Sequence, residues 1–496
     1  MKLTILFGGE AGQGPNLLSN ILGKALIKIG YHVFISREYQ SLIRGGHNFN
    51  ALTFSDKPVY SNESKIDMII CLDENTEKIH KKELKSNGII LKGSKENIYY
   101  AGRLFKLLCL DFRVLEEELR ELGKRFEENI KEAKKGYEDE KKKFCAVKFV
   151  EKNKNQLMNG NKGIAEGAIK SGLDVYYAYP MTPATNVLSE LAEKQIENNI
   201  LILELENEIA VINAAIGSSI TGAKAMVGTS GGGFDLMTEA LSLTGIAEVP
   251  LVAYLSQRPG PATGLATETG QGDLSMARHS GHGEFSRIVL SPGNPEECQE
   301  LVSQAFYFSQ KFKVPAIVIS DKHLSESLFT LTENPKITES KKSTSLIRYN
   351  SYEKDEIGSA TENPEIVEKN VERRLKKGKE IEEEAGKFEQ YKIYGKKDSK
   401  NVIVSWGSTK GAILDAIEKL NACFVQILYI EPFPKDAKKY LKGNVILVEN
   451  NSTAQLGKLI AEKIGILIPD NSKILKFNGR PFLSDELKRE IERKMK

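Results

Sequence analysis

Short apolar runs alternate with helical patterns in the N-terminal part of the chain. The apolar run Leu3–Phe7 is followed by glycines and then by apolar positions at helical spacing over Leu17–Ile29. Further apolar runs lie at Tyr31–Ser36, Asn50–Thr53 and Met68–Leu72. Short apolar runs bounded by turn residues predict buried strands, and strands that alternate with helices predict a parallel, doubly wound α/β sheet.

Two further regions repeat this alternation. In the central region the pattern predicts helices over Ile164–Ser171 and Glu208–Ser219 and from about Leu236, and strands at Val175–Ala178, Ile200–Glu204, Ala223–Gly228, Pro250–Ser256 and Ala316–Ser320. In the C-terminal region it predicts a helix over Thr409–Leu420 and strands at Val402–Trp406, Phe424–Tyr429 and Val445–Val448. We therefore expect an α/β protein built from three doubly wound units.

Two charge-rich stretches separate these units. Arg113–Lys143 combines Glu, Lys and Arg with apolar positions at helical spacing, which predicts a solvated helix or helical hairpin that serves as a connector. Residues 334–398 are polar and end in a helical pattern at Glu365–Lys387, which favours a solvated linker. The predicted domains are then 1–150, 156–333, the linker 334–398, and 399–496.

Length and charge narrow the class of protein. A chain of 496 residues has room for about three domains, at roughly 150 residues each. The 70 Lys and Arg against 67 Asp and Glu leave a net charge of only +3, which argues against a nucleic-acid binder or a polybasic membrane protein. No apolar run approaches the ~18 residues of a membrane helix, and the first residues lack the features of a signal peptide. We expect a soluble cytoplasmic protein.

The five cysteines are scattered, and no two stand at a CxxC spacing: Cys71, Cys109, Cys145, Cys298 and Cys423. An odd number of dispersed thiols argues against a disulfide framework and fits a reducing compartment. The same spacing argues against a zinc ribbon or a cysteine-bound iron–sulfur cluster on this chain.

A glycine-rich turn follows the first predicted strand. It runs Gly8-Gly9-Glu10-Ala11-Gly12-Gln13-Gly14 and precedes a helix, where backbone amides can approach an anion. The spacing is not the dinucleotide fingerprint GxGxxG, although Glu38, after the second strand, stands where a ribose-binding acid could stand. A nicotinamide or flavin site, a structural turn, and contact with another anionic ligand all remain open.

A second glycine motif, Arg44-Gly45-Gly46-His47, follows the next predicted strand. Two glycines between an Arg and a His make a cationic loop suited to an anion. An ordinary surface loop is the alternative.

Polar motifs follow four predicted strands of the central region. Tyr179-Pro180-Met181-Thr182-Pro183 comes after the first, and Glu208 opens a helix after the second. Thr229-Ser230-Gly231 and Gln257-Arg258 follow the other two. Because ligands bind at the carboxyl ends of parallel strands, these motifs predict one shared site. Taken alone, Glu208 is also explained as an acid that favours the helix dipole.

The ordered set of motifs resembles the alpha subunit of 2-oxoacid:ferredoxin oxidoreductases with the gamma subunit fused in front. The glycine-rich start and the Arg-Gly-Gly-His loop are similar to the gamma region. The pyrimidine-binding region is matched by Tyr-Pro-x-Thr-Pro, Glu-x-Glu, Thr-Ser-Gly and Gln-Arg-x-Gly-Pro-x-Thr-Gly. The C-terminal region is matched by Val448-Glu449-Asn450-Asn451-Ser452-Thr453-Ala454-Gln455-Leu456 and Gly479-Arg480-Pro481-Phe482. The resemblance covers nearly the whole chain and implies a gamma-like domain, a thiamine pyrimidine-binding domain and a transketolase C-terminal-like domain.

The resemblance implies a role for each site residue. Glu208 would face N1′ of the thiamine aminopyrimidine, and Arg258 would bind the carboxylate of a 2-oxoacid. Thr182 would hydrogen-bond the same carboxylate, or the carbonyl oxygen as charge develops there. The thiamine diphosphate itself would be held by Tyr179, Pro180, Glu208, Thr229, Ser230 and Gly231. On the gamma-like loop, Arg44 and His47 are candidates for the second carboxylate of 2-oxoglutarate.

The resemblance also implies a partner. Gly272-Asp273-Leu274, with Asn294 later, only partly matches the diphosphate–magnesium signature of thiamine enzymes. A separate beta subunit would therefore supply the diphosphate site, Mg²⁺ and an iron–sulfur cluster, and this chain would hold no metal. The expected assembly is alpha–beta or (alpha–beta)2, with ferredoxin as the electron acceptor and coenzyme A as cosubstrate.

Three functions are compatible with these residues. The first is a coenzyme A-acylating 2-oxoacid:ferredoxin oxidoreductase acting on 2-oxoglutarate, with pyruvate or a broad 2-oxoacid range as the alternative. The second is a non-catalytic paralogue of the same fold, and the third is a nucleotide-dependent dehydrogenase built on the first domain. His279 and His282 are two histidines without a nearby acid or thiol, so we do not predict a metal site there.

Overall fold

The computed structural model describes residues 1–40, 46–93, 96–123, 125–145, 147–151, 155–343 and 348–495. It divides the chain into two compact units, each with its own buried core. The N-terminal unit comprises Met1–Met158, Ser327–Thr332 and Leu483–Lys488, and the second unit comprises Asn159–Glu326, Glu333–Phe482 and Arg489–Lys496. The residue boundaries predicted for the domains stay a prediction.

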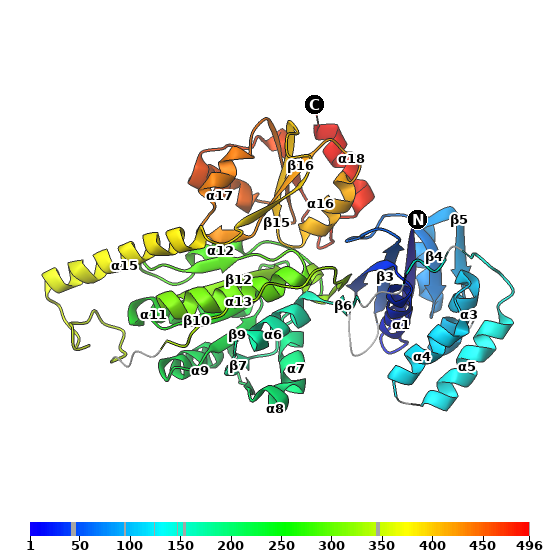
Figure 1. The fold of residues 1–496 in the computed structure, drawn as a ribbon, viewed down its shortest axis with the longest axis horizontal. Helices are drawn as coiled ribbons and strands as arrows, with labels where there is room; N and C mark the ends of the chain where they lie inside the picture. Colours follow the sequence, from blue (N-terminus) through cyan, green and yellow to red (C-terminus); the bar gives the residue numbers. More distant parts are fainter. Residues whose placement is uncertain are drawn as a thin grey trace. The chain divides into compact units, whose positions relative to one another are not determined.

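The sheet of the N-terminal unit is mixed (Figure 1). Its described strands lie in the order β5 (Leu84–Leu91), β4 (Ile66–Cys71), β1 (Lys2–Glu10), β3 (His47–Ser55), β2 (His32–Glu38), β13 (Leu328–Thr330) and β6 (Leu157–Met158). β1, β4 and β5 are parallel, but β3 runs antiparallel to β1 and β2. The expectation of a fully parallel sheet is therefore wrong here. Only residues 39–46 join β2 to β3, too few for the crossover that a parallel pair requires.

Helices α1 (Pro15–Lys28), α2 (Glu74–His80) and α3 (Asn97–Leu108) belong to the same unit, with the hairpin α4 (Phe112–Glu121) and α5 (Phe126–Asp139). The predicted helical hairpin is confirmed, but its interpretation as a solvated connector is wrong. It buries Leu115, Leu119 and Ala133 in the core of the unit. Gly102 makes this packing possible, because a Cβ there would collide with the backbone carbonyl of Ala133.

One disulfide corrects the expectation drawn from the cysteine count. Cys109, directly after α3, is bonded to Cys145, which follows α5. The N–H groups of Phe144 and Cys145 both donate to the carbonyl of Leu107, so the returning chain brings the two sulfur atoms together. Cys71, Cys298 and Cys423 are free and buried. Separation in the sequence could not reveal this pairing, because only the return of α5 along α3 creates it.

The central sheet of the second unit is parallel over most of its width. Its described strands lie in the order β17 (Tyr429–Glu431), β11 (Ile288–Leu290), β12 (Pro315–Asp321), β10 (Leu251–Gln257), β9 (Ala225–Thr229), β7 (Val175–Ala178) and β8 (Leu201–Glu204). Among these described strands, β17 alone is antiparallel to its neighbour. The helices of this part are α6 (Gly160–Lys170), α7 (Thr185–Glu193), α8 (Gln195–Asn198), α9 (Glu208–Ile220), α10 (Gly231–Leu236), α11 (Thr238–Ala247), α12 (Leu274–His279), α13 (Pro295–Phe312) and α14 (Lys322–Glu326).

A second, smaller sheet lies in the same unit. Its order is β14 (Tyr391–Gly395), β16 (Cys423–Ile427), β15 (Asn401–Trp406), β18 (Asn444–Glu449) and β19 (Lys473–Leu475). Helices α16 (Thr409–Ile417), α17 (Gln455–Ile464) and α18 (Ser484–Lys494) accompany it in the sequence, and α15 (Pro364–Ala385) precedes it. The helical pattern predicted at Glu365–Lys387 is thus confirmed as α15. The predicted linker also contains β14, which pairs with β16.

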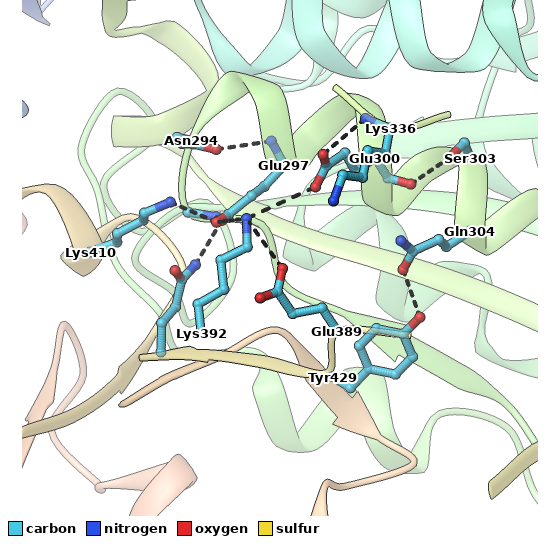
Figure 2. A network of polar contacts seen from close by, with 12 residues as sticks. Asn294, Glu297, Glu300, Ser303, Gln304, Lys336, Glu389, Lys392, Lys410 and Tyr429 are labelled. Carbon is cyan, nitrogen blue, oxygen red and sulfur yellow. Dashed lines mark hydrogen bonds and ion pairs between the residues drawn. The ribbon is translucent and has the colours of Figure 1, made fainter. Parts of the chain in front are cut away.

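A buried ion network joins α13 to the smaller sheet (Figure 2). The carboxylate of Glu297 lies 2.6 Å from Lys410 Nζ and 3.2 Å from Lys392 Nζ, and Gln426 Nε2 donates to it. Asn294 directly precedes this helix and caps it, since its side-chain oxygen accepts from the N–H of Glu297. The partial likeness of Asn294 to a metal-binding asparagine therefore has a local explanation, because the residue caps α13.

Candidate active site

Four strands of the central sheet end side by side. In the parallel register, Ala178 pairs with Gly228 on one side and with Glu204 on the other, and Thr229 pairs with Leu255. The motifs that follow β7, β8, β9 and β10 therefore start from one edge of the sheet. The prediction of a shared site at the carboxyl ends of the strands requires this arrangement.

Arg258 and Thr182 meet at this edge. The Arg258 guanidinium donates to the backbone carbonyl of Thr182 over 3.0 Å. Burial lowers the pKa of Arg258, and no ion pair with a carboxylate is found for it among the described residues. A half-buried guanidinium without a counter-ion is suited to bind a carboxylate in the position that Thr182 borders.

Glu208 is the first residue of α9, yet it does not serve as an exposed helix-end charge. Asn207 caps the helix by accepting from the N–H of Ala210, while the Glu208 side chain turns inward and is only 3% exposed. Its Oε1 has no hydrogen-bond partner among the described residues. A buried acceptor without a partner costs free energy, so this oxygen is placed to receive a donor from a ligand. The helix-dipole explanation fits the exposed Glu206 better.

The Thr229-Ser230-Gly231 motif lies against Glu208. A Cβ on Gly233 would collide with Thr229 Oγ1 and Glu208 Oε1, so the absence of a side chain there makes room for the glutamate. Ser230 is fully buried and stands at the N-cap of α10, but its side chain makes no capping hydrogen bond. Its Oγ also lacks a partner among the described residues. Two unpartnered polar atoms in one small region indicate a site built for a polar ligand.

The remaining predicted residues of this motif group, Tyr179 and Pro180, are partly exposed. Tyr179 is 40% exposed and Pro180 is half-buried. Between them and Thr182, the sulfur of Met181 lies 4.0 Å from Thr229 Oγ1. The segment after β7 therefore reaches the loop after β9, as a shared site requires.

The glycine-rich start borders a separate cavity of about 250 Å³ in the N-terminal unit. Gly12, Gly14, Arg37, Glu38 and Asn50 contribute to its wall. Glu38 thus lies near the glycine loop, as the sequence suggested. The cavity also carries a cation, so an anionic ligand remains compatible with it.

Of the two residues predicted on the gamma-like loop, the structure describes His47, whereas Arg44 falls outside the described residues. His47 begins β3 in the N-terminal unit, where its Nε2 lies 2.8 Å from Nε2 of His80. Burial, together with the neighbouring His80, lowers the pKa of His47, which favours the neutral ring.

The described residues hold no group of three His, Cys, Asp or Glu side chains placed to bind a metal ion. His279 and His282 are accordingly part of no such group. In the described part of the chain, no helix combines the length and apolar character needed to cross a membrane.

Comparison with known proteins identifies the family. Residues 166–394 match the model described as pyruvate flavodoxin/ferredoxin oxidoreductase, thiamine diP-bdg, and residues 4–125 match pyruvate ferredoxin/flavodoxin oxidoreductase. The 2-oxoacid:ferredoxin oxidoreductase subunit alpha of Sulfolobus sp is 30% identical over 98% of this chain and 96% of its own length. The chain belongs to the 2-oxoacid:ferredoxin oxidoreductase alpha-subunit family.

Two further relatives extend the comparison within this family. The 2-oxoglutarate synthase subunit KorA of Methanocaldococcus jannaschii is 29% identical over 61% of this chain and 90% of its own length. The fold matches that of 2-oxoglutarate:ferredoxin oxidoreductase from Magnetococcus marinus, solved with 2-oxoglutarate, coenzyme A and succinyl-CoA bound. That match has a TM-score of 0.89 and 24% identity over 100% of both chains. The resemblance inferred from the motifs and the α/β fold are both confirmed.

The position of Asp273 is one feature of the candidate site that the motifs did not predict. The carboxyl of Asp273 lies beside Gly231, and the backbone N–H of Asp273 donates to Gln257 Oε1 over 2.8 Å. The sequence signal was the short Gly272-Asp273-Leu274 stretch, which matches a metal-binding signature only in part. Its connection to Gly231 depends on a loop that comes from a distant part of the chain.

Proposed function

We propose that the chain is the catalytic alpha subunit of a thiamine-dependent 2-oxoacid:ferredoxin oxidoreductase. The reaction converts a 2-oxoacid and coenzyme A into acyl-CoA, CO2 and a proton, and the two electrons released pass singly to two oxidised ferredoxins. The single observation that carries this proposal is that two side chains at one sheet edge, a carboxylate and a guanidinium, are left open to a ligand. Glu208 offers a buried, unpartnered carboxylate oxygen, and Arg258 offers a guanidinium without a carboxylate among the described residues.

The residues around Glu208 fit a thiamine aminopyrimidine. When bound, thiamine diphosphate supplies a nucleophilic carbon and an electron sink. Glu208 Oε1 would accept a hydrogen bond from the pyrimidine ring and hold the proton that moves to and from the ring nitrogen. Thr229 and the buried Ser230 would complete the pocket, and the glycines after them allow the ring to approach the backbone. Tyr179 and Pro180 would form its rim.

Arg258 and Thr182 would bind the 2-oxoacid. The guanidinium is held in place by its bond to the Thr182 carbonyl and keeps other N–H donors for a carboxylate. The Thr182 hydroxyl would donate to the same carboxylate or to the carbonyl oxygen as negative charge develops there. Their shared role is to orient the substrate relative to the group held by Glu208.

A beta subunit would complete the enzyme by supplying the diphosphate site, Mg²⁺ and the iron–sulfur cluster. Exposed apolar side chains around Glu208 support such a partner: Tyr179, Leu201, Leu203, Ile209 and Leu236 are each at least 37% exposed. They stand on the edge strand β8 and on the segments that follow β7, β8 and β9. Apolar side chains beside a buried polar site are typical of a protein interface. We propose an alpha–beta or (alpha–beta)2 assembly in the cytoplasm, with ferredoxin as its electron acceptor.

We propose 2-oxoglutarate as the substrate, with pyruvate or other 2-oxoacids as the alternative. The names of the Methanocaldococcus and Magnetococcus relatives support 2-oxoglutarate, while both family models are named for pyruvate. Arg44 and His47 stay our candidates for the second carboxylate. If Arg44→Ala changed the KM for 2-oxoglutarate and for pyruvate equally, that assignment would be wrong.

The test uses the chain co-expressed with a beta subunit. Methyl viologen reduction is measured with thiamine diphosphate, Mg²⁺ and coenzyme A, and 2-oxoglutarate and pyruvate are compared in parallel. We expect reduction that requires the 2-oxoacid and falls at least about 100-fold in Glu208→Gln. Glu206→Gln is the matched control, because Glu206 is exposed on the same segment and should leave the rate unchanged. No reduction by an assembled, cluster-loaded complex would favour the non-catalytic paralogue.

A further inference from the structure

Asp273 turns its carboxyl away from its own helix. It directly precedes α12, where an aspartate ordinarily accepts a hydrogen bond from the first helical N–H groups. Its side chain makes no such bond. The carboxyl lies instead over Gly231, where a Cβ would be 2.5 Å from Asp273 Oδ2.

This orientation leaves a buried acceptor without a donor. Asp273 Oδ2 is buried and has no hydrogen-bond partner among the described residues. Burial, and secondarily the charge of Asp235 on α10, raise the pKa of Asp273 to about 6. Both effects destabilise the carboxylate, and a hydrogen-bond donor placed at Oδ2 would relieve them.

The backbone that carries Asp273 is firmly held. Besides the bond from its N–H to Gln257, Gln455 donates to the carbonyl of Gly272 over 2.6 Å and accepts from the N–H of Ser275 over 2.9 Å. Asn451 Nδ2 donates to the carbonyl of Gln271. Asn451 in the loop after β18 and Gln455 at the start of α17 therefore fix the residues on both sides of Asp273, so the unpartnered oxygen has a fixed position.

Three unpartnered polar atoms surround the same turn. Ser230 Oγ and Glu208 Oε1 belong to side chains that are 0% and 3% exposed, and Asp273 Oδ2 is the third. Glu208 lies against Gly233 and Asp273 lies against Gly231, so the two carboxyls flank the first turn of α10. Such a cluster is expected where a ligand supplies the missing partners.

We propose that Asp273 is a further ligand-binding residue of this site, whose Oδ2 accepts a hydrogen bond from the exocyclic amino group of the thiamine pyrimidine. This inference rests on the proposed function. A diphosphate and a 2-oxoacid are anions that present only acceptors to this oxygen, and the carboxylate would repel them. The amino group is the neutral donor that thiamine diphosphate carries besides the ring nitrogen assigned to Glu208.

The test measures binding to the alpha–beta complex by titration calorimetry. The two ligands are thiamine diphosphate and its 4′-deamino analogue, in which hydrogen replaces the amino group. We expect the wild-type complex to prefer thiamine diphosphate. Asp273→Asn should reduce that preference by about 10-fold or more, the size of one hydrogen bond to a charged group. Glu239→Gln, an exposed carboxylate in the first turn of α11, is the matched control and should leave the preference unchanged.

Each outcome decides the proposal. A loss of affinity that is equal for the two ligands, or an unchanged preference in Asp273→Asn, overturns it while the proposed function stands. If the wild-type complex binds neither ligand, the proposed function fails and this inference fails with it. Asp273→Ala tests the same contact if the asparagine variant does not fold, which its thermal unfolding shows.

Discussion

Lys410 Nζ lies 2.6 Å from Glu297 Oε1 inside the second unit, and the two side chains are only 6% and 1% exposed. Lys392 and the N–H of Gly293 also face the carboxylate, and these groups hold the pKa of Glu297 at about 2 despite its burial. The network of Figure 2 therefore joins α13 to the smaller sheet through buried charged groups that compensate one another. Removing one charge leaves the others buried without compensation.

The first prediction concerns the stability of this unit. Glu297→Gln should destabilise the protein by about 3 to 5 kcal/mol, because Lys410 loses its buried counter-ion. Urea unfolding followed by circular dichroism measures the change. Glu300→Gln, one turn later on the same helix and part-exposed, should cost less than about 1 kcal/mol. Similar losses in the two variants would contradict the assigned role of Glu297.

The same carboxylate predicts a dependence on pH. Its pKa falls from 4.5 to about 2 on folding, so its contribution of about 3 kcal/mol is present above pH 4.5 and is lost as the pH falls toward 2. The difference in stability between wild type and Glu297→Gln should therefore shrink when urea unfolding is repeated between pH 7 and pH 3. A difference that stays constant over this range would argue against a charged Glu297.

Two neighbouring glycines predict opposite results at the proposed site. In Gly233→Ala the new methyl group would collide with Thr229 and Glu208, whereas a methyl group on Gly232 would have no described heavy atom within 4 Å. We expect Gly233→Ala to reduce kcat/KM by at least about 10-fold, because the glutamate is displaced. Gly232→Ala should retain activity and gain up to about 1 kcal/mol of stability in α10. Methyl viologen kinetics and thermal unfolding of both complexes check this, and equal activities would place Glu208 outside the reaction.

Substitution of Arg258 should weaken the recognition of the substrate's carboxylate and so lower kcat/KM for the 2-oxoacid. Arg258→Lys keeps the charge but loses the planar pair of donors and the bond to the Thr182 carbonyl. We expect kcat/KM for the 2-oxoacid to fall by about 10- to 100-fold while the affinity for thiamine diphosphate changes little. Arg373→Lys, exposed on α15, provides the matched comparison. A parallel loss of cofactor affinity would show that Arg258 does not act on the substrate alone.

The Cys109–Cys145 bond predicts the number of reactive thiols. After unfolding without reductant, alkylation and mass spectrometry should modify only the three free cysteines, and reductant should expose the remaining pair. Because the bond spans 36 residues, reduction should destabilise the N-terminal unit by roughly 4 kcal/mol. Modification of all the cysteines without reductant would show that the pair is not oxidised.

The sequence alone determined the α/β class and the strand ends at which we propose the site. Short apolar runs predict buried strands, and parallel strands end at one sheet edge, so the meeting of the Thr182, Glu208, Thr229 and Arg258 motifs was predictable. The ordered motifs were also specific enough to identify the family before any comparison.

Tertiary structure alone decided which polar atoms lack partners and which distant segments meet. The antiparallel β3, the Cys109–Cys145 bond, and the contact of Asp273 with Gly231 all depend on how the chain returns to itself. Local periodicity reports which residues prefer burial, but it carries no information on the partner that a buried group finds. The candidate role of Asp273 emerges only from the contacts by which the loop after β18 and the start of α17 hold its neighbours beside α10.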